Sequence, residues 1–126
     1  MRKRNKGFLL TFVIVALALM STVMFVLAGG ANAMLFHADT AYLQAVERNL
    51  LASGLAWARA NIVAKGAAAV AEPVKLSTEG FDVPNAGLTV AITQVQADRA
   101  TVRIATSCTK GRRTLNATRD YAIDLP

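Results

Sequence analysis

The hydrophobic and polar positions divide the chain into three stretches with different periodicities. The first, residues 8–28, is almost entirely apolar, and no charged residue occurs between Phe8 and Phe36. Its length is about what a helix needs to cross a hydrocarbon layer of ~30 Å. It is longer than the core of a typical export signal, which has about 7–15 residues. The pattern therefore predicts a membrane-spanning helix over residues 8–28.

In the second stretch, residues 29–65, apolar residues recur at spacings of three and four, which is typical of an amphipathic helix. One apolar stripe is formed by Leu43, Val46, Leu50, Gly54, Leu55, Ala58 and Ile62. Much of the remaining circumference is polar: Gln44, Glu47, Arg48, Ser53 and Arg59. We expect Gly29–Gly30 to weaken or bend the helix between its two halves and Gly66 to end it.

The third stretch begins with a connecting segment, residues 66–87, which contains two prolines and three glycines and has room for a short strand near Val74 to Ser77. From residue 88 to 126 apolar and polar residues alternate, which indicates half-buried strands, with turns at residues 96–99 and 109–112. The expected inward positions are Leu88, Val90, Ile92, Val102, Ile104, Thr106, Cys108, Leu115, Ala117, Tyr121, Ile123 and Leu125, with an interruption at Arg119. The expected solvated positions include Thr101, Arg103, Thr114, Asn116 and Thr118.

These elements predict an α+β fold. A long N-terminal helix, with a transmembrane half and an amphipathic half, would pack on a small antiparallel meander of three strands.

The charge distribution changes how the basic composition is interpreted. The formal net charge is +6, but four of the fourteen basic residues lie in the first six positions: Arg2, Lys3, Arg4 and Lys6. Basic residues beside a spanning segment stay on the cytoplasmic side, so this charge predicts topology, and nucleic acid is not an expected partner. A smaller cluster, Lys110 with Arg112 and Arg113, fits a solvated turn better than a phosphate or DNA contact.

The chain offers few groups for chemistry. Its one cysteine, Cys108, excludes an internal disulfide and is expected to be buried, and its one histidine, His37, leaves no set of metal ligands. His37 fits an interfacial or packing role, and Trp57 with Tyr42 fits core packing or a subunit contact. No nucleophile–base pair, phosphate-binding loop or carboxylate pair is recognisable. We therefore expect no enzyme activity, cofactor, metal or small-molecule substrate.

The start of the chain, RKRNKGFLLTF, admits three interpretations. It could begin a spanning helix that is never cut, or a leader that is cut directly before the apolar helix. It could also belong to an export signal, because Ala31-Asn32-Ala33 matches a pattern that a leader peptidase cuts after Ala33.

This layout resembles the type IV pilin-like proteins, including the pseudopilins of type II secretion systems. Lys6-Gly7-Phe8 is similar to the cleavage site of their precursors, and Leu9-Leu10-Thr11 continues it. The stretch AVERNLLASGLAWARA (residues 45–60) is similar to part of their helix, and VRIATSCTKGRRTLNAT (residues 102–118) resembles their closing hairpin.

The resemblance implies a leader over residues 1–7, cleavage between Gly7 and Phe8 by a prepilin peptidase, and methylation of the new amino terminus at Phe8. It also implies storage in the bacterial inner membrane, with the amino terminus cytoplasmic and the C-terminal part outside. Partners would be other pilin or pseudopilin subunits through the N-terminal helix, the peptidase and membrane lipid.

One position departs from the family pattern. Most pilins have a glutamate at the fifth residue after the cut, where it pairs with the amino terminus of a neighbouring subunit, and this chain has Phe12 there. Certain minor subunits thought to lie at the fibre tip lack this acid, so Phe12 favours a minor or priming subunit over a major one. The alternatives are a single-pass membrane protein with a small extracytoplasmic binding domain and a secreted protein cut after Ala33.

Overall fold

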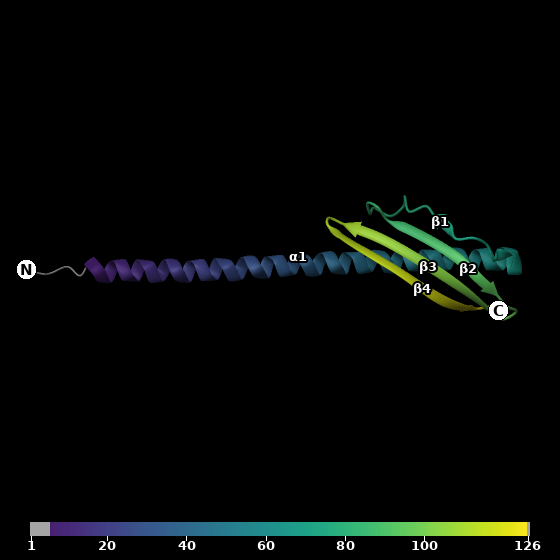
Figure 1. The fold of residues 1–126 in the computed structure, drawn as a ribbon, viewed down its shortest axis with the longest axis horizontal. Helices are drawn as coiled ribbons and strands as arrows, with labels where there is room; N and C mark the ends of the chain where they lie inside the picture. Colours follow the sequence, from purple (N-terminus) through teal and green to yellow (C-terminus); the bar gives the residue numbers. More distant parts are fainter. Residues whose placement is uncertain (1–5, 126) are drawn as a thin grey trace, which may run out of the picture. The chain divides into compact units, whose positions relative to one another are not determined.

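The structure of the chain is a computed structural model that describes residues 6–125. Its elements follow in the order α1 (Lys6–Lys65), a 3₁₀ helix η1 (Gly66–Ala69), β1 (Val74–Leu76), β2 (Gly87–Val95), β3 (Arg99–Lys110) and β4 (Arg113–Asp124) (Figure 1). The described residues belong to two compact units, one ending at Ala38 and the other beginning at Asp39. The long helix and the antiparallel sheet confirm the predicted α+β class.

The helical assignment of α1 includes both glycines of Gly29–Gly30, where the sequence predicts a weak point. An interior glycine costs about 1 kcal/mol relative to alanine, and the leucine and alanine residues around the pair are among the better helix formers. The cost therefore does not interrupt the helix. Gly66 does end it, as predicted, with a φ of +56° in the left-handed region that glycine enters without strain.

The sheet has the strand order β1-β2-β3-β4, and each strand is antiparallel to the next. The predicted three-stranded meander corresponds to β2, β3 and β4, and the turns between them fall inside the predicted ranges. The count of three strands is wrong by one, because Val74–Leu76 adds an edge strand that pairs Leu76 with Leu88. The short strand itself was expected near Val74 to Ser77, but its alternation is too short to predict that it pairs with the sheet.

The core of the second unit lies between the later part of α1 and one face of the sheet (Figure 1). From α1 it takes most of the predicted stripe: Leu43, Val46, Leu50, Ala58 and Ile62. From the sheet it takes alternate residues of the central strands, among them Leu88, Val90, Ile92, Val102, Ile104 and Cys108. A Cβ added at Gly54 would come within 3.2 Å of Ile104 and 3.3 Å of Leu88. This glycine therefore lets α1 approach the sheet closely.

Two predictions about charged residues are wrong. Glu47 is buried, at 8% exposure, and does not belong to the solvated face of α1. Arg119 does not interrupt β4, whose pairing with β3 is continuous from Arg113 to Asp124. The two errors have one cause: the Arg119 guanidinium donates a hydrogen bond to the Glu47 carboxylate at 3.3 Å. This pair lets the strand continue with a charge on its inner face and lets α1 bury an acid.

Candidate processing site and membrane-spanning segment

The predicted cleavage residues lie in the first turn of α1. Gly7 has no atom within 4 Å of the position of a Cβ, and the side chain of Phe8 is 75% exposed. The first turn of a helix has backbone N–H groups without intrahelical partners and frays easily. The bond between Gly7 and Phe8 is thus placed where an enzyme can reach it. Residues 1–5, most of the predicted leader, lie outside the described residues.

Phe12 lies one helical turn after Phe8, on the same side of α1, because residues four apart are neighbours on a helix. Its side chain is 67% exposed. In the sequence Asp39 is the first acidic residue after Phe8. The helix therefore presents an aromatic pair at the position where the pilin-like resemblance leads us to expect an acid.

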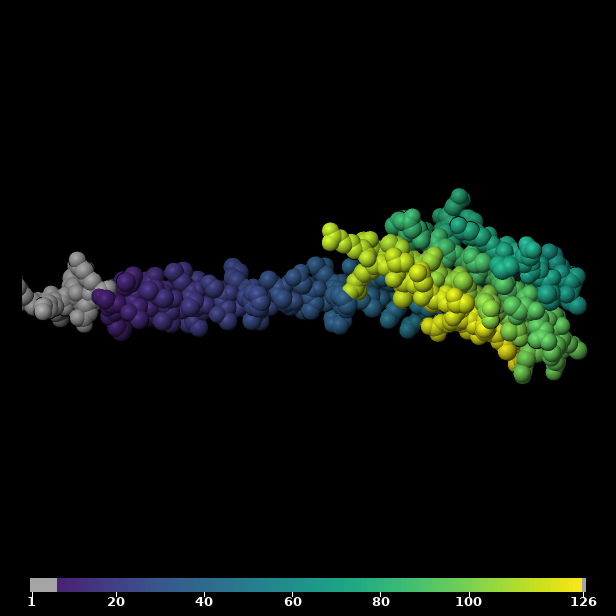
Figure 2. Space-filling view, in the orientation of Figure 1, coloured from purple at the N-terminus to yellow at the C-terminus, as the bar shows by residue number. Residues whose placement is uncertain are grey.

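Residues 7–38 of α1 have the properties of a membrane-spanning segment. An 18-residue window here reaches a mean hydropathy of 2.6, and none of it is buried within the described part of the chain. Figure 2 shows the side chains of this segment at the surface of the visible face. By length and composition α1 is thus able to cross a membrane, which agrees with the predicted single-pass protein.

The three hydroxyl groups of this segment are satisfied within the helix. Thr11 donates to the carbonyl of Gly7 at 2.9 Å, Ser21 to that of Leu17 at 2.9 Å, and Thr22 to that of Ala18 at 2.8 Å. A polar group without a hydrogen bond costs several kcal/mol in hydrocarbon. These bonds remove that cost, so the hydroxyls do not argue against a position in lipid.

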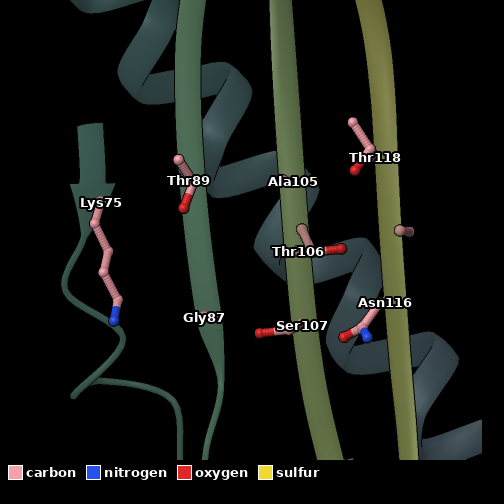
Figure 3. A pocket seen from close by; sticks show the side chains of 9 residues that line it. Lys75, Gly87, Thr89, Ala105, Thr106, Ser107, Asn116 and Thr118 are labelled. Atoms are coloured by element: carbon pink, nitrogen blue, oxygen red, sulfur yellow. The ribbon is translucent and has the colours of Figure 1, made fainter. Parts of the chain in front are cut away.

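The outer face of the sheet has a shallow hollow of about 480 Å³, which is a second candidate for a functional site (Figure 3). Its lining includes Lys75, Thr89, Ser107, Asn116 and Thr118. Gly87 leaves the hollow open, because a Cβ there would approach the Ser107 hydroxyl to 2.6 Å. Lys75 is the one charged group of this lining, so the hollow offers hydroxyl and amide groups without an acid–base pair.

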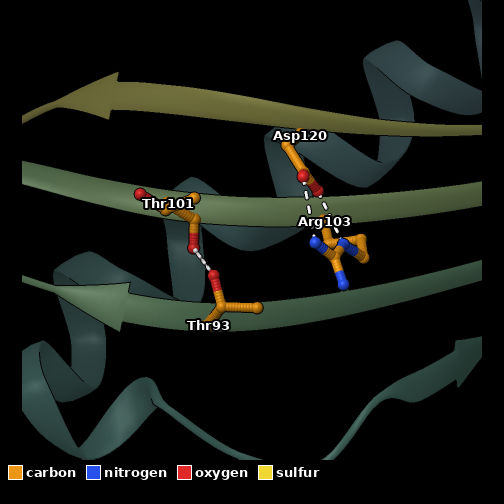
Figure 4. Close-up of polar contacts among 4 residues, drawn as sticks. All are labelled: Thr93, Thr101, Arg103 and Asp120. Atoms are coloured by element: carbon orange, nitrogen blue, oxygen red, sulfur yellow. Dashed lines mark hydrogen bonds and ion pairs between the residues drawn. The ribbon is translucent and has the colours of Figure 1, made fainter.

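Beside this hollow the outer face has an ion pair. Arg103 donates to both carboxylate oxygens of Asp120, at 2.7 and 3.0 Å, and Thr93 donates to the carbonyl of Thr101 at 3.1 Å (Figure 4). The hydrogen bond from Arg103 lowers the pKa of Asp120, and Asp120 in turn raises the pKa of Arg103. A carboxylate held in this way remains ionised near neutral pH and is a poor proton donor.

The described residues offer little for catalysis. They contain no group of three or more histidine, cysteine or acidic residues that could hold a metal ion. Cys108 is buried as predicted, and burial raises the pKa of its thiol, with a smaller contribution from the charge of Glu47. A buried thiol with a raised pKa is a weak nucleophile. His37 is exposed beside Phe36, and Trp57 is half-buried against the core, as a packing role requires.

The basic turn between β3 and β4 differs from the solvated loop that the sequence predicts. Lys110 pairs with Asp39 at 3.0 Å and lies 4.2 Å from the centre of the Tyr42 ring. Arg113 donates to the Thr40 hydroxyl at 2.7 Å. Sequence reasoning did not find these contacts because about 70 residues separate the partners, although opposite charges at Asp39 and Lys110 give a weak signal.

Comparisons with protein-family models, with curated proteins and with solved structures find no match.

Proposed function

We propose that this chain is a non-enzymatic structural subunit, a minor pilin or pseudopilin of a type IV pilus or a type II secretion-like fibre. One observation carries the proposal. A charge-free, exposed helical segment begins at Gly7–Phe8, and the helix to which it belongs goes on to form part of a packed α+β unit. A processing site, a lipid-soluble helix and a small folded unit in this order are what such a precursor requires.

In this proposal a prepilin peptidase cuts between Gly7 and Phe8 and removes the basic leader. The shortened chain stays in the bacterial inner membrane, with its amino terminus at the cytoplasmic side and residues after Asp39 outside. Phe8 becomes the methylated amino terminus. The charge carried by Arg2, Lys3, Arg4 and Lys6, which holds the precursor in place, is lost with the leader.

Assembly then replaces lipid around residues 8–38 by the helices of neighbouring subunits. Lipid tails and apolar side chains are similarly hydrophobic, so this exchange needs close packing more than a gain in hydrophobic burial. Phe12 brings no charge into that packing, whereas an acid without a partner would be costly there. The absence of the acid supports a first or minor subunit, which needs no pairing with the amino terminus of another.

The test is to express the full chain in cells with and without a prepilin peptidase and to measure its mass. We expect loss of residues 1–7 only when the peptidase is present, together with the mass of one methyl group. Gly7→Glu should leave the precursor uncut. Ala33→Leu, which removes the alternative export-signal site, should be processed like the unchanged chain.

Two other outcomes would overturn the proposal. The same full mass with and without the peptidase would identify a single-pass membrane protein that is not processed. A mature chain that begins at Met34, and whose appearance Ala33→Leu prevents, would identify a secreted protein.

A further inference from the structure

The turn between β3 and β4 gathers positive charge beside the first residues of the second unit. Lys110 contacts Asp39 and Tyr42, and Arg113 contacts Thr40. Arg112 is exposed. With three basic residues against one acid, this cluster has a net charge of +2.

Next to these arginines is a hollow of about 410 Å³. Arg112 and Arg113 line it together with the polar side chains of Thr40 and Gln44, and no acidic residue belongs to its lining. Leu115, which is half-buried, adds an apolar part. Two guanidinium groups beside neutral polar groups and a leucine suit a ligand with an anionic, hydrogen-bond-accepting head and an apolar remainder.

The position of the hollow along the chain indicates which ligand of this kind is at hand. Residues 7–38 contain no Lys, Arg, Asp or Glu, and Thr40 follows two positions later. At about 1.5 Å per residue this helical segment extends for roughly 48 Å. That is close to the full thickness of a bilayer with its headgroups, about 40–45 Å. If the segment begins at the cytoplasmic headgroups, the chain reaches Thr40 near the headgroups of the opposite leaflet.

We propose that this hollow binds the phosphate of an anionic phospholipid, such as phosphatidylglycerol, in the extracytoplasmic leaflet. Arg112 and Arg113 donate to the phosphate oxygens, the side chains of Thr40 and Gln44 supply further polar contacts, and the half-buried Leu115 lies against the glycerol and upper acyl carbons. This inference rests on the membrane-spanning part of the proposed function. It is independent of cleavage at Gly7 and of fibre assembly.

The test uses the full chain purified in detergent and titrated with phosphatidylglycerol or phosphatidylcholine, with bound lipid counted by native mass spectrometry. We expect selective binding of phosphatidylglycerol. Because a basic residue near an anionic headgroup contributes about 1 kcal/mol, Arg112→Gln should weaken that binding by about fivefold, and Arg112→Gln with Arg113→Gln by roughly thirtyfold. The leader is the same in all variants, so its own attraction for anionic lipid cancels in the comparison.

The matched control is Arg59→Gln with Lys65→Gln, which removes two positive charges from the exposed surface of α1 near its end. This control should bind phosphatidylglycerol like the unchanged chain. Arg113 bonds to Thr40, so the thermal unfolding of each variant is compared with that of the unchanged chain, and Arg112→Gln serves alone if the double variant unfolds.

The inference is overturned if the control loses as much affinity as the arginine variants, or if phosphatidylcholine binds equally well. It is also overturned if millimolar inorganic phosphate displaces the lipid fully, since the site would then recognise the free ion. If every variant keeps the same preference for phosphatidylglycerol and the chain is still cut after Gly7, the lipid site is wrong and the proposed function stands. If the chain is not cut but binds phosphatidylglycerol through Arg112, the proposed function is wrong and the lipid site stands.

Discussion

The two units of this protein use the same helix in opposite ways. In residues 7–38 no side chain of α1 is buried, and its leucines, valines and phenylalanines are covered by nothing in the described chain. In residues 39–65 one stripe of α1 is sealed against the sheet, and the other side is polar. The difference shows that apolar content alone does not make a core. A stripe repeated at three and four residues binds a sheet, whereas an apolar surface all round requires a partner that surrounds it.

The largest expected effect comes from making one substitution in each unit. Leu50→Ala removes a fully buried side chain and should lower the free energy of unfolding of the second unit by about 3 kcal/mol, because it leaves a cavity. Leu19→Ala, at a side chain that is 63% exposed, should change it by less than about 0.5 kcal/mol. Urea unfolding followed by the fluorescence of the single tryptophan, Trp57, measures both. Equal losses of unfolding free energy would contradict the division of α1 into a half that packs on the sheet and a half that does not.

A second pair of substitutions tests the close approach between α1 and the sheet. Gly54→Leu would force its side chain against Ile104 and Leu88, and we expect a loss of about 2 kcal/mol from overpacking. Gly30→Leu meets nothing within 4 Å of its Cβ and removes a glycine from a helix interior, so it should leave the second unit unchanged. The same unfolding measurement distinguishes them. A tolerated Gly54→Leu would mean that helix and sheet are farther apart than described.

A smaller effect of opposite sign sharpens the description of the sealed half. The hydroxyl of Thr106 is buried on the inner face of the sheet and has no hydrogen-bond partner among the described side chains and backbone groups. Thr106→Val keeps the shape and removes the unsatisfied oxygen, so it should raise the free energy of unfolding by about 1 kcal/mol. Thr101→Val, on the half-exposed outer face of the same strand, is the control and should have little effect. A destabilised Thr106→Val would show that the hydroxyl is hydrogen-bonded after all.

The smallest effect concerns the outer face of the sheet, which contacts solvent, whereas the inner face packs on α1. Because Arg103 lowers the pKa of Asp120, the pair contributes its stability fully above the ordinary carboxyl pKa of about 4. That contribution decreases as the pH falls through the lower pKa of the folded protein. Asp120→Asn should therefore flatten the acid side of a plot of unfolding free energy against pH.

Asp124→Asn, which removes the single 3.3 Å contact with Arg99, is the matched control for that measurement. Both carboxylates are exposed, so the effect should shrink further in high salt. A steeper acid side in Asp120→Asn would contradict the assignment.

Much of the fold follows from local patterns, and the rest depends on contacts that are distant in sequence. Gly66 and the alternation from Leu88 onward are local signals, and they predicted the end of α1 and three of the strands. The ion pair of Glu47 with Arg119 could not be predicted locally, because each charge alone belongs on a surface and only the pairing makes burial tolerable.

The candidate site was predictable to a different extent. The position of Gly7 and Phe8 at the start of an exposed apolar helix follows from hydropathy, and the structure agrees with it. Cleavage itself depends on an enzyme that recognises residues 1–7, so it remains a prediction. The hollow beside Arg112 was not predicted, because it forms only when the turn after β3 folds back onto Thr40 and Leu43.

The burial of Cys108 gives this protein an internal probe of its own opening. It is the only thiol in the chain, it is 1% exposed, and its Sγ lies 3.7 Å from the backbone oxygen of Leu43 on α1. A water-soluble thiol reagent can reach it only when helix and sheet separate, so the rate of modification reports how often that happens. The measurement needs no introduced label. Compared before and after the fibre assembly that we propose, the rate would tell whether neighbouring subunits prevent this unit from opening.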